Sequence, residues 1–241
     1  MACRSATDKR YRCNPMLETL QHIDDNILLA VNGWHCEFFD HFMRVCSDNL
    51  IWAPLYFAII LLFCHRFSTK YVLLLVLAII VMITLSDQLS VNLRHLIGRL
   101  RPAYPGNPFS QMLHIVGDYR IGQYGCPSSH AANSAAITFF CWFVFRQRIL
   151  SLVMKCWMIL VCYSRMYLGV HYFTDLLAGF LFGFIMAALT YYVLIVVARR
   201  LKISTDFISK PKPHSDFVLP LSACLLVLLF LSAFAAYQTW C

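Results

Sequence analysis

Charged side chains are scarce in this sequence. Asp, Glu, Lys and Arg together make up 13% of the 241 residues, whereas soluble domains contain about 25%. Apolar residues account for 60%, and the mean hydropathy is +0.64. This composition excludes an ordinary soluble enzyme, a disordered chain and a coiled coil. It predicts an integral membrane protein, because only a bilayer solvates so much apolar surface.

Several cofactor motifs are also missing. The sequence has no CxxC, no HExxH and no phosphate-binding P-loop, so it indicates neither a metal nor a nucleotide cofactor. Cys126 lies beside a polar motif, where packing is the simpler expectation and reaction of the thiol stays open. Five of the 11 cysteines lie in apolar runs, where Cys packs as a small hydrophobic residue: Cys64, Cys141, Cys156, Cys162 and Cys224.

The net charge of +8 does not indicate a nucleic-acid partner. In a membrane protein, Lys and Arg hold cytoplasmic loops in place and contact anionic lipid. Ten of the 20 basic residues lie in the predicted loops 65–70, 146–155 and 199–212, which places that face in the cytoplasm. Residues 93–130 and 164–175 then face the exoplasmic side of the membrane, although the basic N-terminus counts against this orientation. No pattern indicates an oligomeric state.

Hydrophobic runs predict an all-α, polytopic membrane bundle of about six transmembrane helices, since roughly 20 residues cross the hydrocarbon core. Residues 17–33 carry apolar side chains at helical spacing but are interrupted by acidic residues. This pattern is typical of an N-terminal amphipathic helix that lies in the membrane interface. The expected spans are residues 50–64, 71–85 continuing to about 92, 131–145, 149–163, 176–198 and 218–237.

The same patterns divide the chain into segments. Residues 1–15 form a polar, basic extension without the apolar stretch of a signal peptide, and Met16 is an alternative start to Met1. The remaining segments are the interfacial helices at 16–48, a five-span core at 49–198, a cytoplasmic linker at 199–216 and the sixth transmembrane helix at 217–241.

Three polar clusters fall on the predicted exoplasmic face. In the first, Arg94 and Arg101 are seven residues apart, so on a helix ended by Pro102 they would lie two turns apart on one side. Guanidinium groups that converge at a helix end form a clamp for phosphate, because each offers paired donors. The alternative is that both side chains extend to lipid headgroups.

The second cluster is the segment Cys126-Pro127-Ser128-Ser129-His130, which directly precedes a predicted span. Free backbone N–H groups at the start of a helix bind anions, and the helix dipole adds to the attraction. The alternative is that Ser128 or Ser129 only caps the helix and that His130 lies in the interface.

The third cluster contains Arg165, His171 and Asp175. His171 and Asp175 are four residues apart and would share one face of a helix. A carboxylate on one imidazole nitrogen fixes the tautomer and leaves the other nitrogen as a nucleophile or base. The alternative is a structural ion pair at the end of a span, although ionisable residues in such places indicate function by default.

The combination of the three clusters is more informative than any one of them. Arginines neutralise a phosphoryl group and its transition state, and two imidazoles provide a nucleophile and an acid. The clusters contain no close pair of carboxylates that would hold a metal. We interpret them as a metal-independent phosphoryl-transfer site at a membrane surface.

These motifs resemble the signature of the type-2 phosphatidic-acid phosphatase superfamily, which reads Lys-x6-Arg-Pro, Pro-Ser-Gly-His and Ser-Arg-x5-His-x3-Asp. Motif order and spacing match from residue 94 to 175, and the helical layout matches from about residue 50 to 198. The resemblance implies a membrane phosphatase that acts on a lipid phosphate or diphosphate. Among the lipids that bacterial members use, an exoplasmic site favours undecaprenyl diphosphate or a lipid A phosphate.

The resemblance also implies a role for each site residue. His171 would attack phosphorus and form a phosphohistidine, and Asp175 would orient it. His130 would protonate the leaving oxygen and then activate water. The phosphate would be held by Arg94, Arg101, Ser128, Ser129 and Arg165.

Two residues depart from the family pattern. Arg94 stands where Lys is usual, which keeps the charge but changes its reach. Ser129 stands where Gly is usual, and it would be strained if that position requires a positive φ. Neither departure removes a group that makes or breaks bonds, so we expect an active enzyme.

Two other functions stay open: a lipid phosphotransferase that uses the same phosphohistidine, and a non-catalytic lipid-binding or transport protein. A transporter would more often show intramembrane charges or broken helices in symmetric halves, and the sequence offers only Asp87 near the end of a span. We expect residues 103–125 and the interfacial N-terminal segment to select the substrate. The candidates for headgroup contact are Tyr104, Phe109, His114, Arg120 and Tyr124.

Overall fold

The computed structural model describes residues 15–203 and 217–240. Within them the chain is helical, and the only extended pairing is an isolated bridge between Leu100 and Tyr124. The prediction of an all-α fold is confirmed. The helices are α1 (Pro15–Asn32), α2 (Glu37–Cys46), α3 (Ala53–Arg66), α4 (Thr69–Ile97), α5 (Ser129–Phe145), α6 (Arg148–Tyr167), α7 (Phe173–Arg200) and α8 (Val218–Trp240), with short 3-10 turns η1 (Leu50–Trp52), η2 (Pro108–Met112) and η3 (Val116–Asp118).

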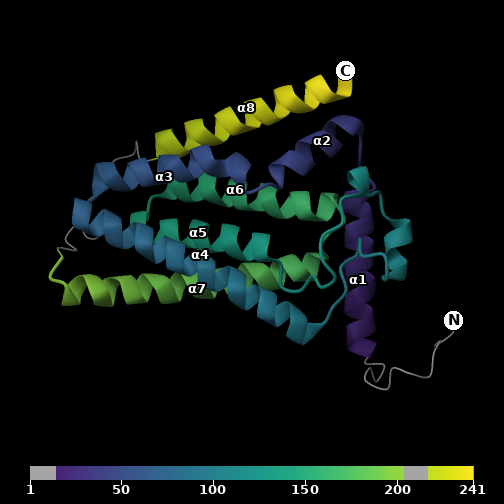
Figure 1. The fold of residues 1–241 in the computed structure, drawn as a ribbon, viewed down its shortest axis with the longest axis horizontal. Helices are drawn as coiled ribbons and strands as arrows, with labels where there is room; N and C mark the ends of the chain where they lie inside the picture. The colour runs from purple at the N-terminus through teal and green to yellow at the C-terminus, as the bar shows by residue number, and fades with distance from the viewer. Residues whose placement is uncertain (1–14, 204–216, 241) are drawn as a thin grey trace.

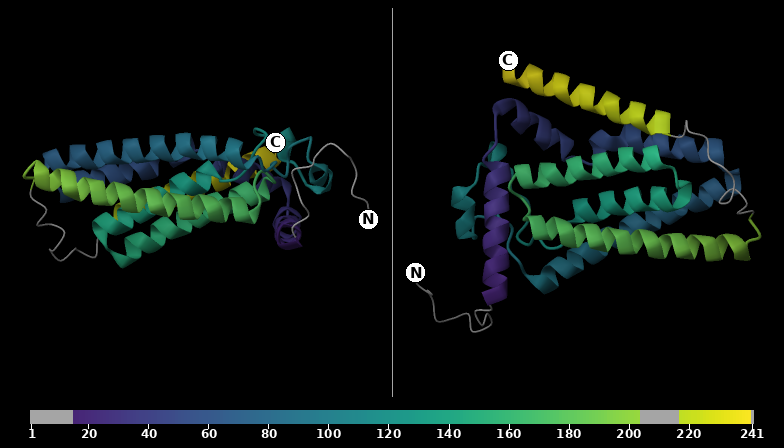
Figure 2. Two further views of the ribbon diagram at one scale, coloured as in Figure 1. Left: turned by 90° about the horizontal axis from the view of Figure 1, so that it is seen from below. Right: turned by 180° about the vertical axis from the view of Figure 1, so that it is seen from behind.

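Helices α3 to α8 run alongside one another as a bundle, and α1 crosses one end of it at a steep angle (Figures 1 and 2). Helix α5 packs most extensively against α7, and α4 packs against both, whereas α8 lies on the outside against α2 and α3. The crosswise direction of α1 suits a helix parallel to a membrane surface. Its location in the interface stays a prediction.

Each of the six predicted spans coincides with a helix of the bundle. By length and composition, α4, α6, α7 and α8 can cross a membrane, and the pair Glu37–Cys46 and Leu50–Arg66, bent by 74°, makes a fifth candidate when taken as one span. Helix α5 has 17 residues, fewer than the roughly 20 that cross the hydrocarbon core. The protein is therefore an integral membrane helical bundle, and the count of six crossings stays a prediction.

Two glycines on α7 allow α5 to come very close. A Cβ at Gly179 would overlap the carbonyl oxygen of Ser128, and a Cβ at Gly183 would overlap that of Ala132. Small residues at these positions let the two backbones approach, as is common between membrane helices. The approach fixes the start of α5, where the second polar motif lies, against the first turns of α7.

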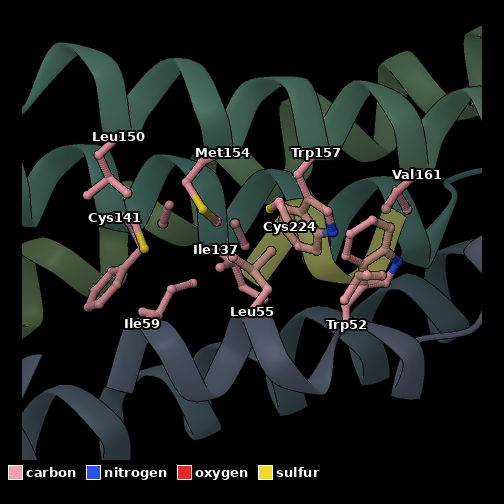
Figure 3. Close-up of a cluster of buried hydrophobic side chains, with 14 of the residues drawn as sticks. Trp52, Leu55, Ile59, Ile137, Cys141, Leu150, Met154, Trp157, Val161 and Cys224 are labelled. Atoms are coloured by element: carbon pink, nitrogen blue, oxygen red, sulfur yellow. The ribbon is translucent and has the colours of Figure 1, made fainter. Parts of the chain in front are cut away.

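The apolar core lies between α3, α5, α6 and α8 (Figure 3). Trp52 packs edge-on against Trp157 with ring centroids 6.0 Å apart, and its indole N–H donates to the carbonyl of Cys46 at 2.9 Å. Cys141 and Cys224 are buried here, as their apolar surroundings predict, whereas Cys64 and Cys156 are exposed and Cys162 is partly buried. This core ties the bent α2–α3 segment to the bundle.

The two ends of the bundle differ in kind. The end of α4, the start of α5, the end of α6 and the start of α7 meet beside α1, together with residues 98–128 (Figure 1). The turns at 67–68, at 146–147 and after α7 lie at the opposite end. All three polar motifs therefore meet at the α1 end. The described basic residues of the three predicted loops lie toward the other end, mostly on helices rather than in loops, because α3 extends to Arg66, α6 begins at Arg148 and α7 extends to Arg200. The predicted extension and most of the linker, residues 1–14 and 204–216, lie outside the described residues.

Candidate active site

The first motif is not helical throughout, contrary to the prediction. Helix α4 ends at Ile97, and Gly98 closes it with a φ of 67°, a left-handed conformation that glycine adopts without strain. The chain then turns, so Pro102 does not end the helix and Arg101 does not lie two turns above Arg94. Backbone hydrogen bonds from Arg101 N to Gln123 O and from Gly125 N to Arg99 O, both 2.9 Å, fix the new direction.

This turn brings the Arg101 guanidinium against His171. Nη1 of Arg101 lies 2.9 Å from Nε2 of His171, and Nε donates to the carbonyl of Tyr124 at 2.9 Å. Arginine only donates, so Nε2 of His171 accepts and carries no proton. Burial, followed by the positive charges of Arg94 and Arg165, lowers the pKa of Arg101 to about 10.

The second motif forms the start of α5. Ser128 is the N-cap, and its Oγ accepts from Ala131 N at 3.5 Å. Ser129 begins the helix, and its Oγ accepts from Arg94 Nη2 at 2.8 Å. In the described chain, the non-glycine residues with positive φ are Asp118, Arg146 and Lys202. The strain considered for Ser129 therefore does not arise, and its hydroxyl instead positions the arginine that replaces the usual lysine.

His130 is half-buried at the start of α5. It lines a small cavity together with Ser47 at the end of α2 and Asn133 one turn along α5. Arg165, His171 and Arg101 are near enough for their charges to act on His130. The predicted acid therefore belongs to the same cluster as the predicted nucleophile.

The third motif also departs from its predicted conformation. Helix α7 begins at Phe173, so His171 precedes it and does not share a helical face with Asp175. The two side chains still meet, with His171 Nδ1 3.6 Å from Asp175 Oδ2, while the same oxygen accepts from Tyr172 N at 3.1 Å. Catalytic contacts of this kind are often long before substrate binds.

His171 is only 1% exposed. Burial, followed by the positive charges of Arg101 and Arg165, lowers its pKa well below the usual value. The imidazole is therefore neutral, with its proton on Nδ1 toward Asp175 and its lone pair on Nε2. This is the tautomer that a nucleophilic histidine requires.

Arg165 is completely buried near the end of α6. Its Nη1 donates to the hydroxyl of Ser47, and the Tyr119 ring lies 5.9 Å from the guanidinium carbon. Among residues 15–203 and 217–240, its Nε and Nη2 have no hydrogen-bond partner, and it forms no ion pair with a carboxylate there. A buried cation in this state is costly by itself, so the arrangement favours an anion beside it.

Sequence reasoning missed a further pair of residues at the site. Nη1 of Arg99 lies 3.0 Å from Asp175 Oδ1, and Nη2 lies 2.6 Å from Asp24 Oδ2 on α1. Arg99 is part of the first motif, but its pattern predicts no role for it, and Asp24 is one of the acidic residues that interrupt the amphipathic pattern of residues 17–33. No local signal joins them, because they are 75 residues apart.

The residues proposed to contact a headgroup make contacts within their own loop. His114 Nε2 lies 2.8 Å from Asp40 Oδ2, and Arg120 donates to the carbonyl of Ala103 at 2.7 Å. The Phe109 ring packs against Tyr172 with centroids 5.9 Å apart. Their contact with a headgroup stays a prediction, as it does for Tyr104 and Tyr124.

An apolar groove adjoins the polar cluster. A cavity of about 430 Å³ lies between α3, α4 and α5 and is lined mainly by isoleucine. It shares Asn49, Tyr56, Asn133 and Ile137 with the small cavity beside His130. An amphiphile could thus place a polar head at the cluster and an apolar chain among the helices.

Comparison with known proteins identifies the family. The sequence profile of the PAP2 superfamily matches residues 71–199, which includes all three motifs. The chain belongs to the PAP2 superfamily. It is 40% identical to a lipid A 4'-phosphatase of Bacteroides thetaiotaomicron over 191 residues, which cover 79% of this chain and 85% of that protein. A lipid A 4'-phosphatase of Porphyromonas gingivalis is 28% identical, with 76% and 78% covered.

A solved PAP2 structure has the same fold. The crystal structure of a transmembrane PAP2-type phosphatidylglycerolphosphate phosphatase from Bacillus subtilis matches with a TM-score of 0.53 and 23% identity, covering 78% of this chain and 89% of that chain. The family match and the relative that is 40% identical confirm the predicted class: an integral membrane phosphatase that acts on lipid phosphates.

Proposed function

We propose that this PAP2 protein removes a phosphate group from a lipid A-type glycolipid through a phosphohistidine on His171, without a metal ion. One observation carries the proposal: Nε2 of a neutral, buried imidazole lies 2.9 Å from the Arg101 guanidinium, beside the partly unpaired and buried Arg165. A nucleophilic nitrogen thus lies among cations suited to hold the phosphate that it attacks.

In the first step, the phosphate of the lipid binds to Arg94, Arg101 and Arg165 and to the N–H groups around Ser129. The Arg101 donor moves from His171 Nε2 to a phosphate oxygen, which frees the lone pair. Nε2 then forms a bond to phosphorus while the bond from phosphorus to the lipid oxygen breaks. Asp175 accepts a hydrogen bond from Nδ1–H, which keeps its proton, and stabilises the positive charge that develops on the ring.

His130 provides the proton in this step. Burial and the charges of Arg165 and Arg101 lower the pKa of His130 in the free protein, and the bound phosphate dianion offsets those charges, so the imidazole carries the proton once the substrate is bound. It passes the proton to the leaving lipid oxygen, so a neutral alcohol departs. In the second step, the now basic His130 takes a proton from water as the water oxygen attacks phosphorus. The bond from phosphorus to Nε2 breaks, inorganic phosphate leaves, and both histidines return to their starting states.

The choice of substrate rests on the relatives and on the groove. Both bacterial relatives described above are lipid A 4'-phosphatases, and the chain spans most of the length of each. The isoleucine-lined groove beside His130 suits an acyl or prenyl chain. Undecaprenyl diphosphate is the competing substrate, because it is also an amphiphile with an accessible terminal phosphate.

The test is phosphate release by the detergent-purified protein. Lipid A phosphates, undecaprenyl diphosphate, phosphatidic acid and phosphatidylglycerol phosphate are compared with and without EDTA, and the 4'- and 1-phosphates of lipid A are scored separately. We expect release from the 4'-position to be fastest and unchanged by EDTA. His171→Ala should lose about 10⁴-fold or more, as an enzyme does without its nucleophile.

Exposed His65, near the end of α3 away from the site, provides the matched control, and His65→Ala should retain full activity. Loss of activity in EDTA that returns with a divalent metal would contradict metal independence. Activity in His171→Ala would contradict the phosphohistidine. Phosphate passed to an added lipid rather than to water would identify a phosphotransferase.

We also propose that the site faces the periplasm and the basic loops face the cytoplasm of an inner membrane, by the positive-inside rule. Two natural cysteines mark the ends of the bundle: exposed Cys36 lies beside α1, and exposed Cys64 lies in the last turns of α3. A membrane-impermeant maleimide applied to intact spheroplasts should modify Cys36, and Cys64 only after lysis. The reverse labelling would overturn the orientation.

A further inference from the structure

A buried carboxylate from outside the three motifs contacts the site. Asp24 lies on α1 and is 0% exposed. Its Oδ1 accepts from the backbone N–H of Thr174 at 3.0 Å, and its Oδ2 accepts from the Thr174 hydroxyl. Thr174 lies in the first turn of α7, immediately before Asp175. The acidic side chain of one helix therefore caps the start of another.

Arg99 joins this carboxylate to Asp175. Its Nη1 donates to Asp175 Oδ1 at 3.0 Å and to the Thr174 hydroxyl at 2.5 Å. Its Nη2 donates to Asp24 Oδ2 at 2.6 Å and to Gln21 Oε1 at 2.7 Å. Burial alone would lower the pKa of Arg99, but Asp175 and Asp24 together raise it above the usual value. The guanidinium is thus fixed as a cation between two carboxylates.

Arg99 differs from the other arginines of the site in its partners. Both of its terminal nitrogens are engaged by α1 and by the first turn of α7, and its guanidinium lies 4.3 Å from the centroid of the Tyr172 ring. Arg165 has free donors, whereas Arg99 has none to spare at these nitrogens. Its terminal nitrogens therefore contact Asp175 and Asp24 and offer no further donor to a phosphate.

We propose that Asp24 and Arg99 are positioning residues, which hold the Asp175 carboxylate in the orientation that supports His171. Asp24 fixes Arg99 and the first turn of α7, and Arg99 fixes one oxygen of Asp175, so the other oxygen is directed to His171 Nδ1. Helix α1 is then a required part of the catalytic unit. The inference rests on the proposed roles of His171 and Asp175.

The experiment compares Asp24→Asn, Arg99→Gln and the double variant in the full-length protein, with Glu18→Gln as a control. Glu18 is an exposed carboxylate on the same helix, α1. Orthovanadate, a phosphate analogue, is titrated first, and its stoichiometry counts the intact phosphate sites in each preparation. Phosphate release is then expressed per intact site, which separates mispositioning from partial unfolding.

We expect each single variant to lose about 100-fold in kcat per intact site, since a small misplacement of a catalytic group has that effect. KM and vanadate affinity should change little, because neither residue touches the phosphate. The kcat of the double variant should be no lower than that of the less active single variant, because both residues act through one contact. Glu18→Gln should match the unchanged protein.

Wild-type kcat per intact site in either single variant would overturn the inference, and so would losses that multiply in the double variant. If Arg99→Gln binds no vanadate, Arg99→Lys replaces it, because lysine keeps the charge but cannot bridge both carboxylates. It should lose about tenfold in kcat, and full activity would count against the inference. His171→Ala is measured in parallel, and activity in that variant would refute the proposed function instead.

Discussion

The two ends of the helical bundle carry the same residue type in opposite states. At the α1 end, Arg101 is 5% exposed and Arg165 is 0% exposed. At the other end, Arg146 and Arg148 are exposed beside the turn that joins α5 to α6. The first pair is held by hydroxyl, carbonyl and imidazole groups, and the second pair extends toward the surroundings.

This difference separates two uses of positive charge in a membrane protein. An exposed arginine near a span end costs little, because it reaches water or anionic headgroups. A buried arginine without a carboxylate partner destabilises the fold unless an anion joins it. Under the proposed function, the α1 end has lower stability because it is built to bind phosphate. In the proposed orientation, the basic residues of the other end hold that end in the cytoplasm.

The strongest test of this difference between the two ends compares Arg165→Gln with Arg146→Gln. Loss of Arg165 should lower kcat/KM by about 10²–10³-fold, as does loss of a donor to transition-state charge. Its melting temperature should stay the same or rise, because a buried charge has been removed. Arg146→Gln should leave phosphate release unchanged. Equal effects of the two substitutions would show that the ends do not differ in function.

Gly179→Ala tests whether the close approach of α7 holds the second motif in place. The new methyl group would push against the Ser128 carbonyl and should cost about 1–3 kcal/mol of stability. Gly183→Ala, one turn farther from the site, should lower the melting temperature similarly but reduce activity less. A greater loss of activity in Gly183→Ala would contradict the importance of this contact.

Ser47→Ala tests the support that α2 gives to Arg165. The Ser47 hydroxyl accepts from Arg165 Nη1, and the loss of one hydrogen bond to a charged group should lower kcat/KM about tenfold. Ser68→Ala, at the exposed turn before α4, is the matched substitution at the opposite end. Unchanged kcat/KM in Ser47→Ala would mean that Arg165 is held by its surroundings alone.

The smallest expected effect is the pH dependence of stability. Burial, followed by Arg101 and Arg165, holds the pKa of His171 well below its usual value, so below about pH 6.5 the unfolded chain takes up a proton that the folded chain does not. Stability is then lost on acidification, by at most about 1.4 kcal/mol per pH unit. The melting temperature of His171→Asn should fall less steeply as the pH is lowered. The melting temperature of the control, His65→Asn, should change with pH as that of the unchanged protein does.

Local patterns were sufficient for much of this protein. Hydrophobic runs located the bundle helices within a few residues, and motif spacing selected His130, His171 and Asp175. The backbone conformation at the ends of α4 and α7, where the motifs lie, was not predictable from these patterns. Proline was expected to end α4, but Gly98 ends it, because a left-handed residue closes the last turn before proline can act. Periodicity likewise could not show that α7 begins after His171.

The sequence by itself determined that the chain enters a membrane, where its basic residues cluster, and which residues are the candidates for phosphoryl-transfer chemistry, because hydropathy and motif spacing are local properties. Only the tertiary structure decided that Arg94 binds Ser129, that Ser47 supports Arg165, and that Asp24 reaches Asp175 through Arg99. Those contacts join residues far apart in the chain. They arise where helix ends converge and buried charges must find partners, which no short-range pattern records.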